Sequence, residues 1–518
     1  MSGRIQKIVI LGGGTAGWMS ALFLTQAFNR GGQRLLEVVL VESAELGTIG
    51  VGESTIPTLR RTMAGLGLDE REMMLACSAS FKLGIRFTNW SAPPAPETYW
   101  HMFVDKPPVT AGLPAWHAWL KEQRDGSREP FAEGCVDAVD ICYRNKAPKQ
   151  PGDASFVGPV AYAYHLDAGL LGNYLKQKAI AAGVRHVVDN VVDVTHHEGD
   201  HIRALITATS GAVEGDLFID CSGFRGWLIN RAQHEPFESF ADCLFCDRAL
   251  ATTVPLAADA PIKPFTSSTA MGAGWIWDIP LYDRRGVGYV YASAFCSDTQ
   301  AETELLSYLH VAEPSRPIRK LRMRVGRTRS PWVGNCVAIG LSGGFVEPLE
   351  ATGIFTIEIG LQQLWENFPL SDINPILRDR YNCTMRMYYQ DIRDFLVLHY
   401  CLTRRNDTEF WRTNHSHPAV PDSLKDKLER WRHFLPQPGE IPEPKLFSEF
   451  SYISILAGMD ALPAGVAPLP AVEYASRSEM ERSIEALDER RRMLRNSMPE
   501  HRAYLNSLRE QPAPHLGP

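Results

Sequence analysis

Residues 8–18 read Ile8-Val9-Ile10-Leu11-Gly12-Gly13-Gly14-Thr15-Ala16-Gly17-Trp18, an apolar run that leads directly into a glycine-rich turn. The apolar residues over 5–11 predict a buried strand, and the uncharged stretch over 15–28 predicts a helix. A second apolar run over 36–42 predicts another strand, which completes a β-α-β unit. This order of elements predicts a parallel, doubly wound α/β fold of the Rossmann-like type.

The glycine-rich turn has the spacing of a dinucleotide-binding site. Gly12, Gly14 and Gly17 form the pattern Gly-x-Gly-x-x-Gly between the predicted strand and helix. Glycines at these positions allow a tight turn and a close approach of the backbone to a pyrophosphate, whose charge the helix N-terminus favours. Glu42, at the end of the second predicted strand, can accept a hydrogen bond from a ribose hydroxyl. The pattern does not distinguish FAD from NAD.

A second glycine-rich turn lies far along the chain, in residues 336–348. A short apolar run there enters Gly340-Leu341-Ser342-Gly343-Gly344, and Pro348 follows. Such a turn can present backbone N–H groups to a flavin ring or an anion. Two nucleotide-facing turns so far apart in one chain point to FAD bound in an extended pose.

The composition is that of an ordinary soluble protein. The 518 residues are 45% hydrophobic and 22% charged, with a net charge of −7. No basic stripe is present, so nucleic acid and anionic membrane surfaces are not expected partners. The uncharged run over 8–29 resembles a signal peptide or membrane span, but glycines interrupt it and no cleavage site follows. The ten cysteines are scattered, so we expect reduced thiols and a cytoplasmic location.

Two groups of metal-binding residue types occur, and we expect neither to hold a metal. Cys243 and Cys246 form a single Cys-x-x-Cys without the second pair that a zinc site needs. His196, His197 and His201 flank a Glu-Gly-Asp turn between two β-like runs, which favours an exposed hairpin tip.

Lys82 lies in a segment with the alternation of a strand. Every second residue from Phe81 to Phe87 is apolar, and Lys82 stands between two of these positions. A strand directs alternate side chains to opposite faces, so the local pattern predicts a solvated lysine. Trp275 and Trp277 are also two residues apart, and on pattern alone they would pack together in a core.

Taken together, these and further motifs resemble the flavin-dependent tryptophan halogenases. The stretch over 392–411 is also similar. The motifs that carry the resemblance occur in one order along the chain: Gly12-Gly13-Gly14-Thr15-Ala16-Gly17-Trp18, Val51-Gly52-Glu53-Ser54-Thr55, Phe81-Lys82, Trp275-x-Trp277-x-Ile279-Pro280 and Pro348-Leu349-Glu350-Ala351-Thr352-Gly353-Ile354.

The resemblance implies a reaction and a set of roles. Reduced FAD, supplied by a separate NADH-dependent flavin reductase, reacts with oxygen and with chloride or bromide to give hypohalous acid. Lys82 then delivers the halogen to an aromatic substrate, with Glu350 as its catalytic partner. Further positions match the family's flavin contacts, halide-binding backbone and tunnel residues: Gly12, Gly14, Thr15, Ala16, Gly17, Glu42, Glu53, Val191, Leu341 and Ile354 for FAD; Thr352 and Gly353 for the halide; Trp275, Trp277, Ile279 and Pro280 for the tunnel.

Two interpretations of Lys82 and Glu350 agree with their chemistry. An ammonium can hydrogen-bond hypohalous acid, whereas a neutral amine of lowered pKa can itself be halogenated. A carboxylate can orient the electrophile or accept the proton that the ring loses. Ala351 replaces the serine that is usual after the glutamate, so one hydroxyl between the flavin and lysine sites is missing.

The substrate residues match the family only in part. His101 and Phe103 correspond to the aromatic pair that helps to sandwich an indole, and Tyr452 stands where a stacking tryptophan is usual. Residues 436–447 lack the tandem tyrosines that help to hold the amino-acid end. Indole, a tryptophan-containing peptide or a larger indole derivative is therefore as plausible a substrate as free tryptophan.

The resemblance also implies a division of the chain. We expect a FAD-binding module of the GR2 or hydroxylase type over 1–360, with antiparallel β elements over 184–220 and a substrate-site insertion around 80–150. A mainly helical substrate region follows over 361–518, where apolar residues recur at helical spacing: Met385, Tyr389, Ile392, Phe395, Leu396 and His399. A homodimer is compatible with this organisation.

Two other functions are consistent with a flavin site. A FAD-dependent aromatic monooxygenase would share the first glycine-rich turn but would need neither Lys82 nor the Trp-x-Trp-x-Ile-Pro motif. A flavin-binding redox sensor or interaction protein would not need an intact Lys82 and Glu350. Because these features are present, halogenation of an indole-type arene is the favoured hypothesis.

Overall fold

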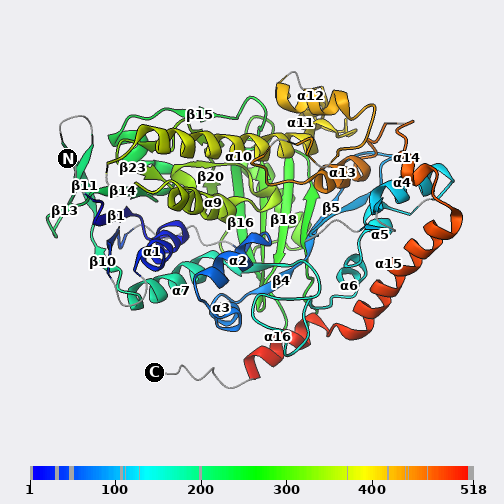
Figure 1. The fold of residues 1–518 in the computed structure, drawn as a ribbon, viewed down its shortest axis with the longest axis horizontal. Coiled ribbons are helices and arrows are strands. Elements are labelled where there is room, and N and C mark those ends of the chain that lie inside the picture. The colour runs from blue at the N-terminus through cyan, green and yellow to red at the C-terminus, as the bar shows by residue number, and fades with distance from the viewer. Residues whose placement is uncertain are drawn as a thin grey trace. The chain divides into compact units, whose positions relative to one another are not determined.

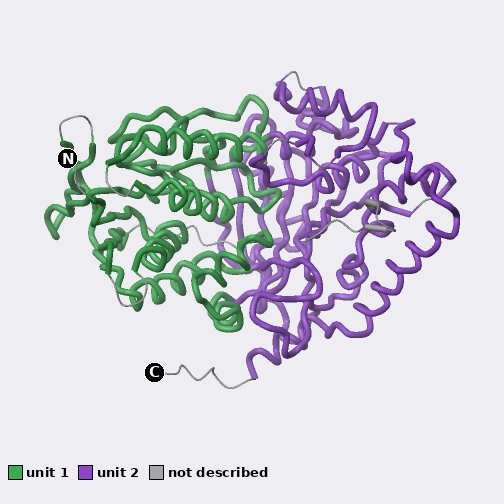
Figure 2. The backbone as a smooth tube through the Cα atoms, in the orientation of Figure 1, with its two compact units in different colours: residues 1–77, 166–247, 322–393 green, residues 78–165, 248–321, 394–518 purple. Residues whose placement is uncertain are grey.

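The computed structural model describes residues 4–29, 34–45, 52–104, 109–110, 113–127, 129–197, 201–369, 372–416, 419–437, 439–441, 443–463 and 465–510. The chain forms two compact units, shown in Figure 2. Unit 1 contains residues 1–77, 166–247 and 322–393, and unit 2 contains residues 78–165, 248–321 and 394–518. The chain crosses between the two units several times, and the expected division near residue 360 stays a prediction.

Unit 1 is built on a six-stranded sheet in the order β10-β2-β1-β14-β23-β22 (Figure 1). β1 (Lys7–Leu11) lies parallel to both β2 (Glu37–Glu42) and β14 (Leu217–Asp220). β10 (Arg185–Val188) and β23 (Cys336–Ala338) extend the parallel part, and β22 (Trp332–Val333) is antiparallel to β23. Ile8, Val9 and Ile10 have no exposed surface, as expected of a parallel strand covered on both faces. The predicted doubly wound α/β fold is confirmed.

The first helices and turns of unit 1 follow the sequence pattern closely. α1 spans Thr15–Phe28 and packs beside α7 (Ala168–Ala181). The antiparallel elements expected over 184–220 are β11 (Val191–His196), β12 (Ile202–Thr207) and β13 (Ala212–Glu214). The backbone N–H of His197 donates to His201 at 2.7 Å, so the histidines do lie at a hairpin tip, of which residues 198–200 are outside the described ranges.

Unit 2 contains a seven-stranded sheet in the order β20-β16-β19-β18-β17-β5-β6. Its central strands are β16 (Arg248–Pro255), β19 (Arg284–Tyr291), β18 (Gly274–Pro280) and β17 (Thr266–Ala270). β5 (Gly84–Thr88) is parallel to β17 and antiparallel to β6 (Thr98–Met102). Just before β5, the short strand β4 (Ser80–Lys82) pairs instead with β9 (Ala163–Asp167). The chain therefore changes sheets at Leu83.

The C-terminal part of the chain is helical, as expected. α10 spans Pro375–Cys401, and its predicted apolar face is buried throughout. α15 (Arg477–Ser497) begins with the capping box of Ser476 and Glu479. Within the described ranges, no helix combines the length and apolar character needed to cross a membrane. The other helices are α2 (Thr58–Gly65), α3 (Glu70–Ala76), α4 (Ala115–Arg124), α5 (Phe131–Cys135), α6 (Val139–Tyr143), α8 (Asp298–Leu309), α9 (Gly353–Glu366), α11 (Glu409–His415), α12 (Asp422–Arg430), α13 (Glu449–Gly458), α14 (Pro470–Glu473), α15 (Arg477–Ser497) and α16 (His501–Glu510).

The remaining short elements complete the two units. Unit 1 contains β3 (Gly52–Ser54), β15 (Phe237–Ser239), β21 (Gly326–Thr328) and β24 (Gly344–Phe345), with the helical turns η1 (Gly223–Arg225), η2 (Trp227–Ala232), η3 (Gly340–Ser342) and η4 (Pro348–Glu350). Unit 2 contains the small hairpin of β7 (Val109–Thr110) and β8 (Leu113–Pro114). β20 spans Arg319–Arg322.

Two helices of unit 1 are joined through a buried carboxyl. Glu358 on α9 accepts hydrogen bonds from the hydroxyls of Thr58, at 2.9 Å, and Thr62, both on α2. Burial raises the pKa of Glu358 to about 7, although the two threonine hydroxyls and Arg61 act in the opposite direction. The carboxyl therefore takes up a proton more readily in the folded state than in the unfolded state.

This pKa predicts a dependence of stability on pH. Because the folded state binds the extra proton, the free energy of unfolding should fall as pH rises from about 4.5 to about 7. The variant Glu358→Gln cannot ionise and should escape this loss, which amounts to at most about 3 kcal/mol. Urea unfolding of both proteins at pH 5 and pH 7.5 measures the difference, and an identical pH dependence in the two would contradict the assignment.

Candidate functional site

The first glycine-rich turn is shaped by close backbone contacts in unit 1. Gly12 has a φ of +117°, and a Cβ there would lie 2.3 Å from the carbonyl oxygen of Cys221. A Cβ on Gly17 would lie 1.8 Å from the Gly12 carbonyl oxygen. A Cβ on Gly14 would meet nothing within 4 Å, and Gly14 is the N-cap of α1 without a side-chain cap. The helix start therefore faces open space, which fits a pyrophosphate.

Glu42 is held at the edge of this turn. Its Oε1 lies 2.7 Å from the Lys176 Nζ and 2.7 Å from the His186 Nε2. Its Oε2 lies so close to Gly13 that a Cβ there would be 1.5 Å away. The carboxylate is thus fixed beside the glycine-rich turn at the end of β2, which is the position that the ribose interaction requires.

The other predicted flavin residues of unit 1 surround the second turn and the start of β11. A Cβ on Gly340, whose φ is +74°, would lie 2.8 Å from the Ala16 Cβ, so η3, which contains Leu341, packs closely on the first turn of α1. Thr15 Oγ1 donates to the Ala168 carbonyl at 3.2 Å. Val191 begins β11 and is half-buried.

Glu53, whose side chain is half-buried, is a second carboxyl with a raised pKa. It lies in β3 (Gly52–Ser54), and burial raises its pKa to about 7, with the carboxylate of Asp167 acting in the same direction. At neutral pH this group is therefore divided between its two protonation states. A protonated carboxyl can donate a hydrogen bond, which an ordinary glutamate cannot do.

The start of α9 carries the residues predicted to bind a halide. Glu350, in η4 (Pro348–Glu350), is 2% exposed, and Ala351 adopts a left-handed φ of +59°. Thr352 is the N-cap of α9, and its buried Oγ1 has no hydrogen-bond partner among the described residues. A Cβ on Gly353 would meet nothing within 4 Å, so the helix start is open at this point. An open helix N-terminus with an additional hydroxyl donor suits a small anion.

In unit 2, Lys82 is completely buried, so the solvated position predicted from alternation is wrong. The reason is that both faces of β4 are covered. The ring of Phe81 lies 5.7 Å from His501 and 5.6 Å from Tyr504, both of α16. On the other side, Lys82 Nζ lies 4.9 Å from the centre of the Phe103 ring. The apolar alternation is valid only from β5 onward, after the chain has changed sheets.

The Trp-x-Trp-x-Ile-Pro motif forms β18, in which every residue is buried. The ring centres of Trp275 and Trp277 are 6.2 Å apart, as expected for aromatic residues on one face of a strand. The indole Nε1 of Trp277 is buried without a hydrogen-bond partner among the described residues. Ile279 and Pro280 end the strand.

His101 belongs to an aromatic cluster, which we define as His101, Phe395, Phe447 and Tyr452. The rings of Phe395 and Phe447 are stacked, with centres 3.8 Å apart. The ring of His101 lies 5.5 Å from Phe395 and 6.3 Å from Phe447. Tyr452 meets Phe395 edge-on at 5.0 Å. The rings packed on His101 are thus those of Phe395 and Phe447, which the sequence did not single out as substrate residues.

Tyr452 is tied to a buried ion pair. Lys427 Nζ donates to the Tyr452 hydroxyl at 3.1 Å and lies 3.6 Å from the carboxylate of Asp394. Ser423 Oγ donates to the same carboxylate at 2.6 Å. Lys427 and Asp394 have side chains that are 9% and 3% exposed. This group was not foreseen, because its members come from α10, α12 and α13 and share no local pattern.

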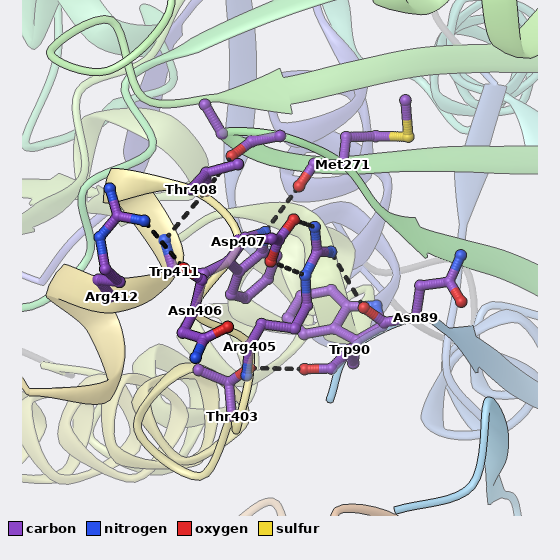
Figure 3. Close-up of polar contacts among 12 residues, drawn as sticks. Asn89, Trp90, Met271, Thr403, Arg405, Asn406, Asp407, Thr408, Trp411 and Arg412 are labelled. Carbon is purple, nitrogen blue, oxygen red and sulfur yellow. Dashed lines mark hydrogen bonds and ion pairs between the residues drawn. The ribbon is translucent and has the colours of Figure 1, made fainter. Parts of the chain in front are cut away.

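The turn before β18 is anchored to the segment that follows α10. Trp411 Nε1 donates to the Met271 carbonyl at 2.7 Å, as Figure 3 shows. Thr408 Oγ1 donates to the Gly272 carbonyl at 2.7 Å. The guanidinium of Arg405 lies 4.6 Å from the centre of the Trp411 ring and is paired with Asp407. The tryptophan motif is therefore held from a distant part of the sequence.

Removing one of these bonds should destabilise the protein. In Trp411→Phe the Met271 carbonyl loses its donor, so we expect the free energy of unfolding to fall by about 1 kcal/mol. Urea unfolding measures the change. Trp365→Phe is the matched control, because Trp365 is 53% exposed, and the expectation fails if both substitutions have the same effect.

Comparison with known proteins places this geometry in context. A family model described as tryptophan halogenase matches residues 7–474. Tryptophan 6-halogenase SttH of Streptomyces toxytricini is 39% identical over 97% of this chain and 98% of its own length. Its crystal structure has a TM-score of 0.89 to this chain and 40% sequence identity, covering 97% of this chain and all of the other.

Two further halogenases are similar to this chain over nearly its whole length. Tryptophan 7-halogenase RebH of Lentzea aerocolonigenes is 36% identical over 98% of this chain and 99% of its own. The solved structure of BrvH, a flavin-dependent halogenase from Brevundimonas sp. BAL3, is 36% identical with a TM-score of 0.87, covering 98% of this chain and 99% of its own.

Proposed function

We propose that this chain, which belongs to the tryptophan halogenase family, is a flavin-dependent halogenase of an indole-type arene. The observation that carries the proposal is the burial of Lys82 beside the face of Phe103, at the junction of two sheets. A lysine kept out of water at such a place is expected to have a chemical role. A hydroxylase or a redox sensor would need neither this lysine nor β18.

The residues of unit 1 fit FAD. Gly12, Gly14 and Gly17 would receive the pyrophosphate, Glu42 the ribose, and Glu53 the flavin. Bound in its reduced form, FAD supplies the electrons with which oxygen and chloride or bromide are converted to hypohalous acid. We propose that the backbone of Thr352 and Gly353 holds the halide, supported by the open start of α9 and by the Thr352 hydroxyl, which has no hydrogen-bond partner within the described part of the chain. A separate NADH-dependent reductase would supply the reduced flavin.

We propose that Lys82 presents the hypohalous acid to the arene. Its ammonium donates a hydrogen bond to the oxygen of the acid, which polarises the bond between oxygen and halogen. A ring carbon then forms a bond to the halogen as the oxygen–halogen bond breaks. The departing hydroxide takes a proton from the Lys82 ammonium and leaves as water, and Glu350 accepts the proton that the ring loses. Proton exchange with solvent then restores both side chains. Trp275 and Trp277 would line the path of the acid.

The substrate is proposed to be an indole-type arene, which includes free tryptophan, indole and larger indole derivatives. SttH and RebH are named for their action on tryptophan. In this chain the stacked rings of Phe395 and Phe447 beside His101 suit a flat, electron-rich ring. The Tyr452 hydroxyl is already engaged by Lys427, so Tyr452 is less suited to hold the amino-acid end of tryptophan.

Replacement of the lysine should abolish halogenation and leave flavin binding intact. Lys82→Met preserves the volume of the side chain but removes the ammonium, so we expect the halogenation rate to fall by about a thousandfold. Purified protein is supplied with FAD, a flavin reductase, NADH, oxygen, bromide and either indole or tryptophan. Mass spectrometry then measures the product by its halogen isotope pattern.

Lys149→Met provides a matched control, because Lys149 is 2% exposed and belongs to the same unit, where it donates to the Ala154 carbonyl. This variant should retain halogenation. A hydroxylated product from the wild-type protein, or full halogenation by Lys82→Met, would overturn the proposal.

The aromatic cluster should determine how well the arene binds. Phe447→Ala removes one of the stacked rings, and we expect kcat/KM for indole to fall about fivefold, mainly through KM. Flavin affinity, measured by fluorescence quenching, should not change. In the control Phe434→Ala, the lost ring is 39% exposed, and kinetic constants equal to those of Phe447→Ala would argue against a role for the cluster.

A further inference from the structure

A chain of buried hydrogen bonds lies beside Lys82 in unit 2. Ser80 and His165 face each other across the antiparallel ladder of β4 and β9. Lys82 is two residues from Ser80, so it projects from the same face of the strand. Ser80, Lys82 and His165 all have no exposed surface. The lysine and the histidine are therefore diagonal neighbours in a dry environment.

The directions of these bonds follow from the number of protons available. The Ser80 hydroxyl donates to the carbonyl oxygen of Pro280, which can only accept. Since a hydroxyl has one proton, the contact of 3.4 Å between Ser80 Oγ and His165 Nδ1 needs a proton on the histidine. His165 Nε2 is then an acceptor for the Thr266 hydroxyl, 2.9 Å away. The order of donation is Thr266, His165, Ser80 and Pro280.

The electrostatics of the site agree with this single neutral tautomer. Burial lowers the pKa of His165 well below its ordinary value, and the nearby Lys82 and His501 act in the same direction, whereas a hydrogen bond to the Pro280 backbone acts in the opposite direction. The pKa of His501 is itself lowered by burial to about 3. Its Nε2 accepts from the backbone N–H of Phe81 at 3.0 Å. The imidazole beside Lys82 is thus an uncharged connector and not a second cation.

Ser80 and His165, which we call the connector, join the strand that carries Lys82 to the tryptophan motif. Pro280 ends β18, which carries Trp275 and Trp277, and Thr266 begins β17, which pairs with β18 through residues 267–270. Ser80 and His165 thereby link β4 and β9, on the lysine side, with two strands of the larger sheet. The link holds β4, the strand that carries Lys82, against the end of β18.

We propose that Ser80 and His165 are positioning residues that set how efficiently hypohalous acid passes from the tryptophan strand to Lys82. This inference rests on the proposed function. In the wild-type protein, the acid reaches the ammonium and halogenates the arene, with water as the second product. When a hydrogen bond of the connector is removed, β4 shifts relative to β18. More hypohalous acid then escapes before its halogen is transferred to the arene.

The test measures the fate of the acid as well as the amount of product. The complete protein is assayed with FAD, reductase, NADH, oxygen, bromide and indole, in the presence of a 1,3-diketone and catalase. The diketone captures escaped acid by forming a carbon–bromine bond and releasing water. The readout is the ratio of brominated indole to brominated diketone, together with the sum of the two products.

Ser80→Ala should lower the ratio of brominated indole to brominated diketone by about tenfold, because small displacements of a positioned group have large kinetic effects. The summed bromination should stay constant, since flavin chemistry is untouched. Thr266→Val should lower the ratio in the same way, and Ser80→Thr, which keeps the hydroxyl, should restore it.

Ser268→Ala is the matched control. Ser268 is equally buried on β17, but its hydroxyl has no hydrogen-bond partner among the described residues. An unchanged ratio in Ser80→Ala, an equal fall in Ser268→Ala, or a fall only in summed bromination would each overturn the inference. Absence of any bromination by the wild-type protein would instead contradict the proposed function.

Discussion

A lysine side chain held out of water at the junction of two β-sheets is the constraint on which the arrangement of unit 2 depends. Burial of a cation is costly unless nearby groups stabilise it. Here the chain ends β4 at Lys82 and begins β5 at Gly84, so one peptide segment is shared by two ladders. The face of Phe103 lies 4.9 Å from Nζ, and a ring face attracts a cation. Such a position is maintained only if both sheets are fixed.

The surroundings of Lys82 come from distant parts of the sequence. α16 covers the Phe81 side of β4, β9 pairs with it, and β17 and β18 belong to the larger sheet. The segment after α10 holds the turn that precedes β18 through Trp411 and Thr408. None of these segments surrounds Lys82 by itself. This explains why unit 2 is assembled from three separated stretches of the chain.

The aromatic cluster contacts a group of buried polar side chains through Tyr452. Lys427, Asp394 and Ser423 form a satisfied network that ends at the Tyr452 hydroxyl. A buried ion pair adds little net stability, but it fixes the geometry of the groups it binds. The ring of Tyr452 is thereby held edge-on to Phe395, and the stacked pair of Phe395 and Phe447 is left beside His101. In the proposed substrate site, the rings that a flat substrate would meet come from α10 and from the segment before α13.

The sequence by itself determined the features that depend on local backbone sterics. Gly12 and Gly17 must be glycine because a Cβ would collide with the backbone, and this requirement is visible in the sequence as the Gly-x-Gly-x-x-Gly spacing. The strands, the first helix and the tryptophan pair on β18 follow from side-chain periodicity in the same way. The motif order also predicted a functional role for Lys82, although its own alternation pattern predicted a solvated environment. The tertiary structure alone decided that Lys82 is buried, that Phe395 and Phe447 rather than Tyr452 pack on His101, and that His165 joins two sheets. Burial and hydrogen-bond partners depend on which distant segments cover a strand, and local sequence carries no record of that choice.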